Sequence, residues 1–221
     1  MHLGRGKLRV AHTTMIDRIQ WLGHGSFVIQ GPPRIYINPW RVARGDQPAD
    51  IILISHDHYD HCSQADTNKL RDAHTLVIGN ERVAREIEGC TVIRPWQSMT
   101  EDRVCIKAVP AYSPNDWRHP VEEGGLGFVI SLNLYDIYYA GDTQLIPEMM
   151  NLHPDIAILP IDGRGTMTVD EAVEAVHQLK PRWVIPSNWG SHPEGASRLE
   201  AQAFRRQAES YAEVLLLEQT L

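Results

Sequence analysis

The sequence predicts a single α/β domain in which helices cover the outer faces of β-sheets. Its 221 residues, 43% of them hydrophobic, suffice for one large core. Short β-rich runs follow one another through the first third of the chain, with few helical signals between them. Later runs alternate with amphipathic segments, and no internal repeat or linker interrupts the pattern. These three observations favour layered packing of sheets and helices over two smaller domains.

The expected strands are short runs rich in aliphatic and β-branched residues, bounded by Gly, Pro or polar residues. They are predicted at 16–23, 26–30, 34–38, 51–55, 75–79, 104–110, 127–132, 136–141, 156–160, 183–187 and 213–218. The first fourteen residues show no periodicity and contain no acidic side chain. We therefore expect a flexible N-terminal extension, residues 1–14, followed by a single domain, residues 15–221.

Helical segments are expected between these strands, at 64–73, 81–88, 168–179 and 197–212. The third has the clearest signals. Thr168 can cap its N-terminus, and Glu171 three residues later completes a capping box. Pro181 ends the helix, and its apolar face consists of Val169, Ala172, Val173 and Val176.

Composition and charge argue against several classes of partner. With 21 Lys and Arg against 28 Asp and Glu, the net charge is −7, and no basic stripe is present to bind nucleic acid. No apolar run approaches the ~20 residues that span a membrane, and no apolar segment follows the basic start as in a secretory signal. Cys62, Cys90 and Cys105 are widely spaced and form no CxxC pair. An odd number of such thiols suits a reducing compartment, so a cytoplasmic location is predicted.

The stretch "SHDHYDHCS" begins at Ser55, directly after the apolar run 51–54. It places His56, His58, Asp60 and His61 within six residues, where α/β proteins position ligands at the carboxyl end of a strand. His56 and His58 point to the same side in an extended backbone, whereas the other two enter from the following turn. Imidazoles and carboxylates are the ligands that Zn²⁺ prefers. A metal site is therefore predicted, in preference to a solvated loop that is rich in histidine.

This arrangement, His-x-His-x-Asp-His after an apolar strand, resembles the signature of the metallo-β-lactamase superfamily. Further stretches agree with it in order along the chain: "WLGHGSFVI" from Trp21, "VPAYSPNDWRHP" from Val109, "YYAGDTQLIPEM" from Tyr138 and "VIPSNWG" from Val184. Together they resemble the branch of metal-dependent hydrolases that includes ascorbate-phosphate lactonases. The resemblance implies a four-layer αββα sandwich with a metal cleft at one edge of its two sheets.

The resemblance also implies roles for individual residues. His56, His58 and His119 would hold a first metal ion, although a His in the polar "WRHP" loop can also be an ordinary surface residue. Asp142, in "AGDT", matches the carboxylate that bridges two ions, and its alternative is a turn residue that bonds its own backbone. Asp60 and His61 would serve the second ion.

At the second ion the chain departs from the family pattern. The family usually places a His in a Pro-x-His context, whereas this chain has "PSNWG" with Asn188 at that position. An amide oxygen is a weaker ligand for Zn²⁺ than an imidazole nitrogen. The second site is thus expected to be weak, empty or better suited to Mn²⁺. His192, four residues further on, is an alternative ligand or a plain loop residue.

Two other segments are candidates for contact with substrate. His24, in "LGHGSF", faces the cleft in similar sequences, which favours a role in binding or proton transfer. An equal alternative is a histidine whose hydrogen bonds are satisfied within a tight, Gly-flanked turn. The Gly-rich "DGRGT" that begins at Asp162 is a loop able to approach substrate, but its spacing is not that of a phosphate-binding P-loop.

These residues predict a metal-dependent hydrolase that attacks a small ester, lactone or phosphodiester with metal-bound hydroxide. One or two Zn²⁺ ions are the expected cofactors, and Asp60 would orient the hydroxide and pass its proton to the leaving group. The expected substrate is a small molecule, because 221 residues leave no room for an added domain that grips nucleic acid. The alternative is a degenerate scaffold that binds a ligand or partner without turnover, for which Asn188 is the evidence.

Overall fold

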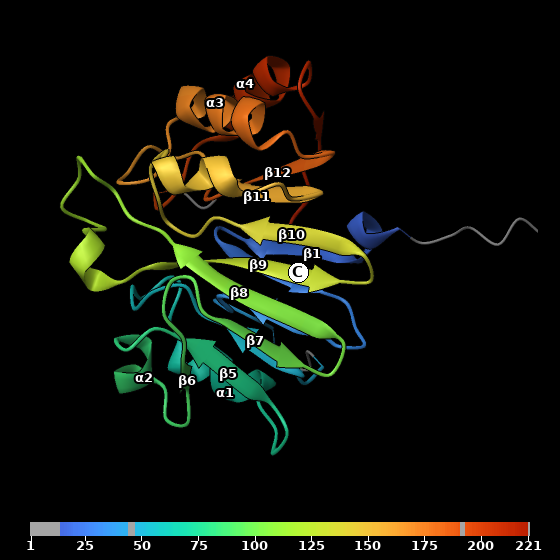
Figure 1. Cartoon of the computed structure of the whole chain (residues 1–221), viewed down its shortest axis with the longest axis vertical. Coiled ribbons are helices and arrows are strands. Elements are labelled where there is room, and N and C mark those ends of the chain that lie inside the picture. The colour runs from blue at the N-terminus through green and yellow to red at the C-terminus, as the bar shows by residue number, and fades with distance from the viewer. Residues whose placement is uncertain (1–13, 44–46, 191–192, 221) are drawn as a thin grey trace, which may run out of the picture.

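Two β-sheets lie face to face with helices on both outer sides, in a computed structural model that describes residues 14–43, 47–190 and 193–220 (Figure 1). Helices α1 (Gln64–Leu70) and α2 (Val83–Glu86) lie beyond the first sheet, and α3 (Val169–Leu179) and α4 (Arg198–Ala208) lie beyond the second. The four-layer α/β sandwich is therefore confirmed. The predicted extension, apart from Thr14, lies outside the described residues.

The first sheet contains the N-terminal strands in sequential order. These are β1 (Ile19–Gly23), β2 (Ser26–Ile29), β3 (Ile35–Ile37), β4 (Ile51–Leu53), β5 (Leu76–Gly79) and β6 (Thr91–Val92). The strands β1 to β3 pair antiparallel, whereas β3 to β6 pair parallel. Every residue of β4 is buried, as expected for a parallel strand covered on both faces.

The second sheet has the order β13-β12-β11-β10-β9-β8-β7. Its strands are β7 (Ser98–Glu101), β8 (Val104–Pro110), β9 (Leu126–Leu132), β10 (Tyr135–Tyr139), β11 (Ile156–Pro160), β12 (Trp183–Ser187) and β13 (Glu213–Val214). Its antiparallel half, β7 to β10, adjoins a parallel half, β10 to β13. Three short 3₁₀ helices complete the described elements: Met15–Arg18, Val121–Glu123 and Pro147–Asn151.

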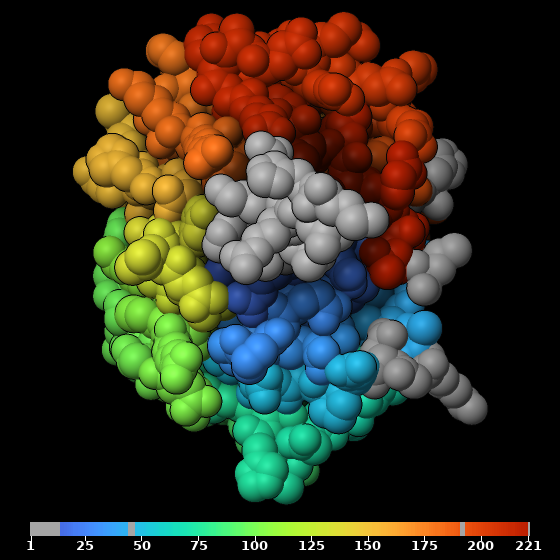
Figure 2. Space-filling view, turned by 90° about the vertical axis from the view of Figure 1, so that its right-hand side faces the viewer, coloured from blue at the N-terminus to red at the C-terminus, as the bar shows by residue number. Residues whose placement is uncertain are grey.

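The main hydrophobic core fills the space between the two sheets and continues under α3 and α4. Phe27 from β2 and Phe128 from β9 are fully buried in it. A smaller cluster, which includes Ile52, Val77 and Val83, packs between the first sheet and its two helices. Each fully buried side chain of this size stabilises the fold by about 1.5–3 kcal/mol. In the side view of Figure 2, the orange and red C-terminal residues lie at the top and the teal residues of the first sheet's helical side lie at the bottom.

The predicted elements are confirmed with some changes of length. The capping box of Thr168 and Glu171 is present at α3, which ends at Leu179 with Lys180 in the left-handed conformation. Helix α4 stops at Ala208, four residues before the expected end, because Glu209 to Tyr211 are exposed and have no apolar face to bury. The strand expected at 213–218 is reduced to Glu213–Val214, and the edge strands β6 and β7 were not predicted.

No helix within the described part of the chain is long and apolar enough to cross a membrane.

Candidate metal centre

The first group of candidate ligands begins where β4 ends. Ser55 is fully buried, and its hydroxyl lies 2.9 Å from Nδ1 of His56, which fixes the orientation of that imidazole ring. The chain then turns, with the His61 amide donating to the carbonyl of His58 at 2.9 Å. The rings of His56 and His58 lie 4.6 Å apart, centroid to centroid. A buried strand thus delivers two imidazoles to the same side of one edge of the sheet.

His119 reaches this pair from the loop that follows β8. Its Nδ1 lies 2.8 Å from the carbonyl oxygen of Gly165, so Nδ1 donates and Nε2 remains available as a ligand. Gly165 has φ of +74°, and a Cβ at this position would lie 3.0 Å from Nδ1 of His119. The Gly-rich loop therefore supports a metal ligand, a role that the sequence alone did not reveal. The ligand atoms of His56, His58 and His119 all lie within 4.8 Å of one another.

Asp142 stands between this group and the next. It follows β10, and its Oδ2 lies 3.4 Å from Nε2 of His119 and 3.8 Å from Nε2 of His56. Its other oxygen, Oδ1, lies 3.2 Å from Nε2 of His61. One carboxylate thus faces both groups with different oxygen atoms, as a bridge between two ions requires.

The second group gathers around His61. Its Nδ1 lies 3.0 Å from Oδ1 of Asp60, whose Oδ2 lies 3.2 Å from Nε2 of His24. Asn188, at the end of β12, donates through Nδ2 to Oδ1 of Asp142 at 2.8 Å. The structure therefore brings His24 and Asn188 to the same place as the predicted second-site residues. His192 lies outside the described residues.

Several polar atoms at the centre are buried without a hydrogen-bond partner in the described part of the chain. They include Nε2 of His56, His61 and His119, and Oδ1 of Asn188. An unpaired buried polar atom costs about 1–3 kcal/mol, so such a cluster indicates a missing partner such as an ion. Gly25 leaves room beside it, because a Cβ there would lie 2.6 Å from Nε2 of His61. Both the donor types and the space fit a divalent metal.

The charges at the centre shift its pKa values in opposite directions. Burial, with the neighbouring His61, lowers the pKa of His56 well below its usual value. Burial also acts to lower the pKa of His61, but the carboxylates of Asp142 and Asp60 raise it to about 10. Although burial alone would raise the pKa of Asp142, the His61 charge holds it well below its usual range. Without metal, His61 is therefore protonated, and its positive charge balances the neighbouring carboxylates as a bound cation would.

Because His61 is protonated in the metal-free protein, metal binding is expected to release protons. At pH 6 His61 is protonated and His56 is neutral, so saturation of the metal-free protein with Zn²⁺ should release at least the His61 proton from each chain. At this pH, metal-bound water near pKa ~7 contributes little. Calorimetric titration in buffers with different heats of ionisation measures the number released. A binding heat independent of the buffer would contradict the protonation state assigned to His61.

Some of the candidate ligands line a cleft of about 370 Å³. His58, Asp60, His119 and Asp142 form part of its wall, and its rim carries Trp117, Arg118, Arg164 and Glu194. The Trp117 side chain is 81% exposed. Asp162 also faces the cleft, and burial together with the charge of Asp142 raises its pKa. Asp162 and Arg164 of the "DGRGT" loop thus line the cleft, and Gly165 of the same loop supports His119.

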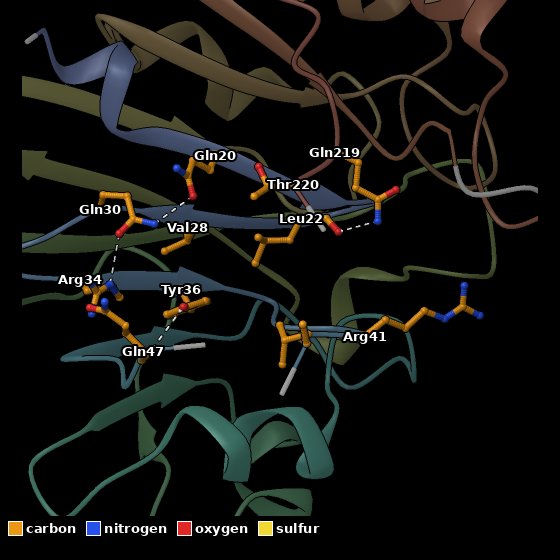
Figure 3. A pocket seen from close by; sticks show the side chains of 12 residues that line it. Gln20, Leu22, Val28, Gln30, Arg34, Tyr36, Arg41, Gln47, Gln219 and Thr220 are labelled. Carbon is orange, nitrogen blue, oxygen red and sulfur yellow. Dashed lines mark hydrogen bonds between the residues drawn. The ribbon is translucent and has the colours of Figure 1, made fainter. Parts of the chain in front are cut away.

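A second cavity of about 370 Å³ lies on the outer face of β1 to β3 (Figure 3). None of the twelve described residues that line it is a His, Cys, Asp or Glu, the side chains that bind metal or transfer protons most readily. The guanidinium of Arg41 points away from it, above the Trp40 ring at 3.9 Å. The chemistry is therefore concentrated in the metal cleft.

Asn38 is a further residue of the centre that the sequence did not indicate. It is fully buried at the end of β3 with φ of +45°. Its Nδ2 donates to the hydroxyls of Ser55 and Tyr139 at 2.9 and 2.8 Å, and its Oδ1 accepts from the Ser55 amide at 2.8 Å. The Tyr139 hydroxyl in turn donates to the carbonyl of Gly25 at 3.0 Å. This network, which we call the Asn38 clamp, connects the two sheets directly behind the ligands.

Residues 18–188 match the profile of the "Beta-lactamase superfamily domain". The chain belongs to the metallo-β-lactamase superfamily. Within this superfamily it is 35% identical over 218 residues to a "UPF0173 metal-dependent hydrolase" of Thermococcus onnurineus, covering 90% of this chain and 96% of the relative. A protein of the same description from Thermococcus kodakarensis is 32% identical over 220 residues, which cover 91% and 96% of the two chains.

Solved structures of two other proteins show the same fold. A putative metal-dependent hydrolase from Parabacteroides distasonis superposes with a TM-score of 0.82 at 28% identity, covering 91% of this chain and 93% of that one. A metallo hydrolase from Ignicoccus hospitalis has a TM-score of 0.75 at 23% identity, with 92% and 95% coverage. The chain is therefore a superfamily member of the metal-dependent hydrolase class. The narrower resemblance to ascorbate-phosphate lactonases stays a prediction.

Proposed function

We propose that this protein hydrolyses a small ester, lactone or phosphodiester with the help of one or two Zn²⁺ ions. The observation that carries the proposal is the convergence of unpaired imidazole nitrogens on the two oxygens of Asp142 at the wall of a cleft. His56, His58 and His119 would hold the first ion. Asp60, His61 and Asn188 would hold the second, with Asp142 between the two.

The residues of the cleft supply the remaining steps. Zn²⁺ bound there would lower the pKa of water from about 15.7 toward about 7, so that hydroxide is available at neutral pH. Asp60 would accept the proton of the attacking water and pass it to the leaving group. Its position is held by His24 on one oxygen and by His61 on the other. Asn188 holds Asp142 in a similar way.

Properties of the cleft support a small substrate. A volume of about 370 Å³ lies in the range of ordinary small-molecule sites. Arg164 at its rim would favour a substrate with negative charge, whereas Arg118 is paired with Asp116. The exposed Trp117 ring offers the substrate an apolar surface. The net charge of −7 disfavours nucleic acid. Free Cys62, Cys90 and Cys105 support a reducing, cytoplasmic environment.

The second ion could differ from the first. In the set Asp60, His61, Asp142 and Asn188, three of four side chains offer oxygen, which suits Mn²⁺ better than Zn²⁺. Metal identity is therefore part of the proposal to be tested.

The deciding experiment combines metal analysis with assays. Protein purified without chelator is expected to contain Zn²⁺ or Mn²⁺ and to hydrolyse at least one of three probes: a nitrophenyl ester, a simple lactone or bis(p-nitrophenyl) phosphate. Chelation should abolish turnover, and added metal should restore it. Stoichiometric metal without turnover of any probe would favour the non-catalytic scaffold. Protein that binds no divalent metal at all would contradict the metal site itself.

A further inference from the structure

His24 lies next to the position where the second site lacks an imidazole. It occupies the tight turn between β1 and β2, with φ of +49°. Its backbone carbonyl accepts a hydrogen bond from the backbone N–H of Asn188 at 3.1 Å and another from Nε1 of Trp21 at 2.9 Å. The backbone of His24 is thus tied to Asn188, and its ring extends toward Asp60 in the cleft. A fixed backbone at this point allows the ring to take up one defined position.

The His24 ring is not satisfied as a structural turn histidine would be. It is 2% exposed, and its Nδ1 has no hydrogen-bond partner in the described part of the chain. Its Nε2 lies 3.2 Å from Oδ2 of Asp60. His56, His61 and His119 are also buried and each also has one unpaired ring nitrogen, which is Nε2 in those three residues and Nδ1 in His24. This property groups His24 with the candidate ligands rather than with the supporting residues.

The distances agree with a shared ion. Two donor atoms bound to one Zn²⁺ at about 2.0–2.2 Å in tetrahedral geometry lie roughly 3.3–3.6 Å apart. Nε2 of His24 lies 3.2 Å from Oδ2 of Asp60, close to this range. Nε2 of His61 lies at the same distance from Oδ1 of Asp142. The ligand atoms of His24, Asp60 and His61 all lie within 4.8 Å of one another.

We propose that a ring nitrogen of His24 is a ligand of the second metal ion and supplies the imidazole that Asn188 does not. The second site then consists of His24, Asp60, His61 and Asp142, two nitrogen and two oxygen donors. Asn188 becomes a positioning residue that holds Asp142 through Nδ2. This inference rests on the proposed metal-dependent function, and it restores to the second site an affinity for Zn²⁺ that the sequence did not predict.

The test is a zinc titration of metal-free wild type and His24→Gln, followed by calorimetry. Glutamine can still donate a hydrogen bond to Asp60, but its amide oxygen is a poor ligand for Zn²⁺. We expect the first equivalent to bind both proteins with similar affinity. The second should bind His24→Gln about a hundredfold or more weakly, beyond the ten- to hundredfold effects of supporting residues. His74→Gln, at an exposed histidine, is the matched control and should leave both equivalents unchanged.

Two results would overturn the inference. One is an unchanged second affinity in His24→Gln, which would mean that His24 only donates a hydrogen bond to Asp60. The other is a larger loss in Asn188→Ala than in His24→Gln, which would make Asn188 the ligand. Wild type that binds no zinc would instead overturn the proposed function as well. A wild type that binds two ions without hydrolysing any probe would contradict the function alone.

An independent measurement on the wild type covers the case in which a variant fails to fold. In ¹⁵N-histidine-labelled protein, a ring nitrogen of His24 should change its chemical shift as the second equivalent of Zn²⁺ is added. His24→Asn, which tolerates positive φ, provides the assignment of these signals. A His24 ring that keeps its metal-free shifts with two ions bound would contradict ligation.

Discussion

His56→Ala should remove the first metal ion and lower kcat/KM by on the order of a thousandfold or more, because the proposed hydrolysis depends on the ion that His56, His58 and His119 would hold. The orientation of His56 is fixed by its neighbours. Its ring is held by Ser55 on one side, and its Nε2 faces Asp142 at 3.8 Å on the other. Elemental analysis of the purified variant and the assay that detects wild-type turnover measure the two effects.

The fold of His56→Ala should remain intact, because the residue lies beyond the end of β4 and outside the main core. Circular dichroism and thermal unfolding of the metal-free proteins check this. His74→Ala, at an exposed position, should retain both metal and activity. A variant that keeps its full metal content would show that His56 is not a ligand.

Asp142→Asn should weaken both ions together, which separates it from every single-imidazole variant. The substitution keeps the shape of the side chain but removes the charge that faces His56 and His119 with one oxygen and His61 with the other. A neutral amide is a poor bridge between two cations, so activity should fall by at least as much as in His56→Ala. Calorimetry should show the loss at both equivalents of Zn²⁺.

The matched control for this variant is Asp102→Asn. Asp102 is exposed in the turn between β7 and β8, and its φ of +49° suits asparagine. The Asp102→Asn variant should bind two ions as the wild type does. Loss of only one ion in Asp142→Asn would mean that Asp142 serves a single site and is not a bridge.

The sequence predicts the sandwich well where burial alone decides the structure. Every residue of β4 and β11 is buried, and a continuous apolar run indicates such a strand without reference to its neighbours. The sequence predicts poorly those strands that form only because a neighbouring strand pairs with them. Strand β7, "SMTE", is mostly exposed and exists because β8 lies beside it. Residues 215–217 are apolar and pack against the core, but the strand pairing ends at Val214.

For the candidate site, the local motif was sufficient for the residues that are close in sequence. His56, His58, Asp60 and His61 are recognisable because the spacing itself carries the chemistry. Asn38 could not be found this way, because its importance comes from contacts with Ser55 and Tyr139 across both sheets. The proximity of His24 to Asn188 could not be predicted from sequence motifs either. His24 is its neighbour through a backbone hydrogen bond between distant segments.

The candidate metal centre, like the Asn38 clamp behind it, is shared between the two sheets. This arrangement has a consequence for how the protein acquires its metal. The candidate ligands come from the first sheet's loops, around residues 24–61, and from the second sheet's loops, around residues 119–188. Neither half of the chain holds a complete site, so an unfolded or half-folded chain has little affinity for the ions. Metal would bind only after the sheets have docked, and it would then act as a late cross-link between the halves. Unfolding should accordingly begin with separation of the sheets, and bound metal should slow that separation most.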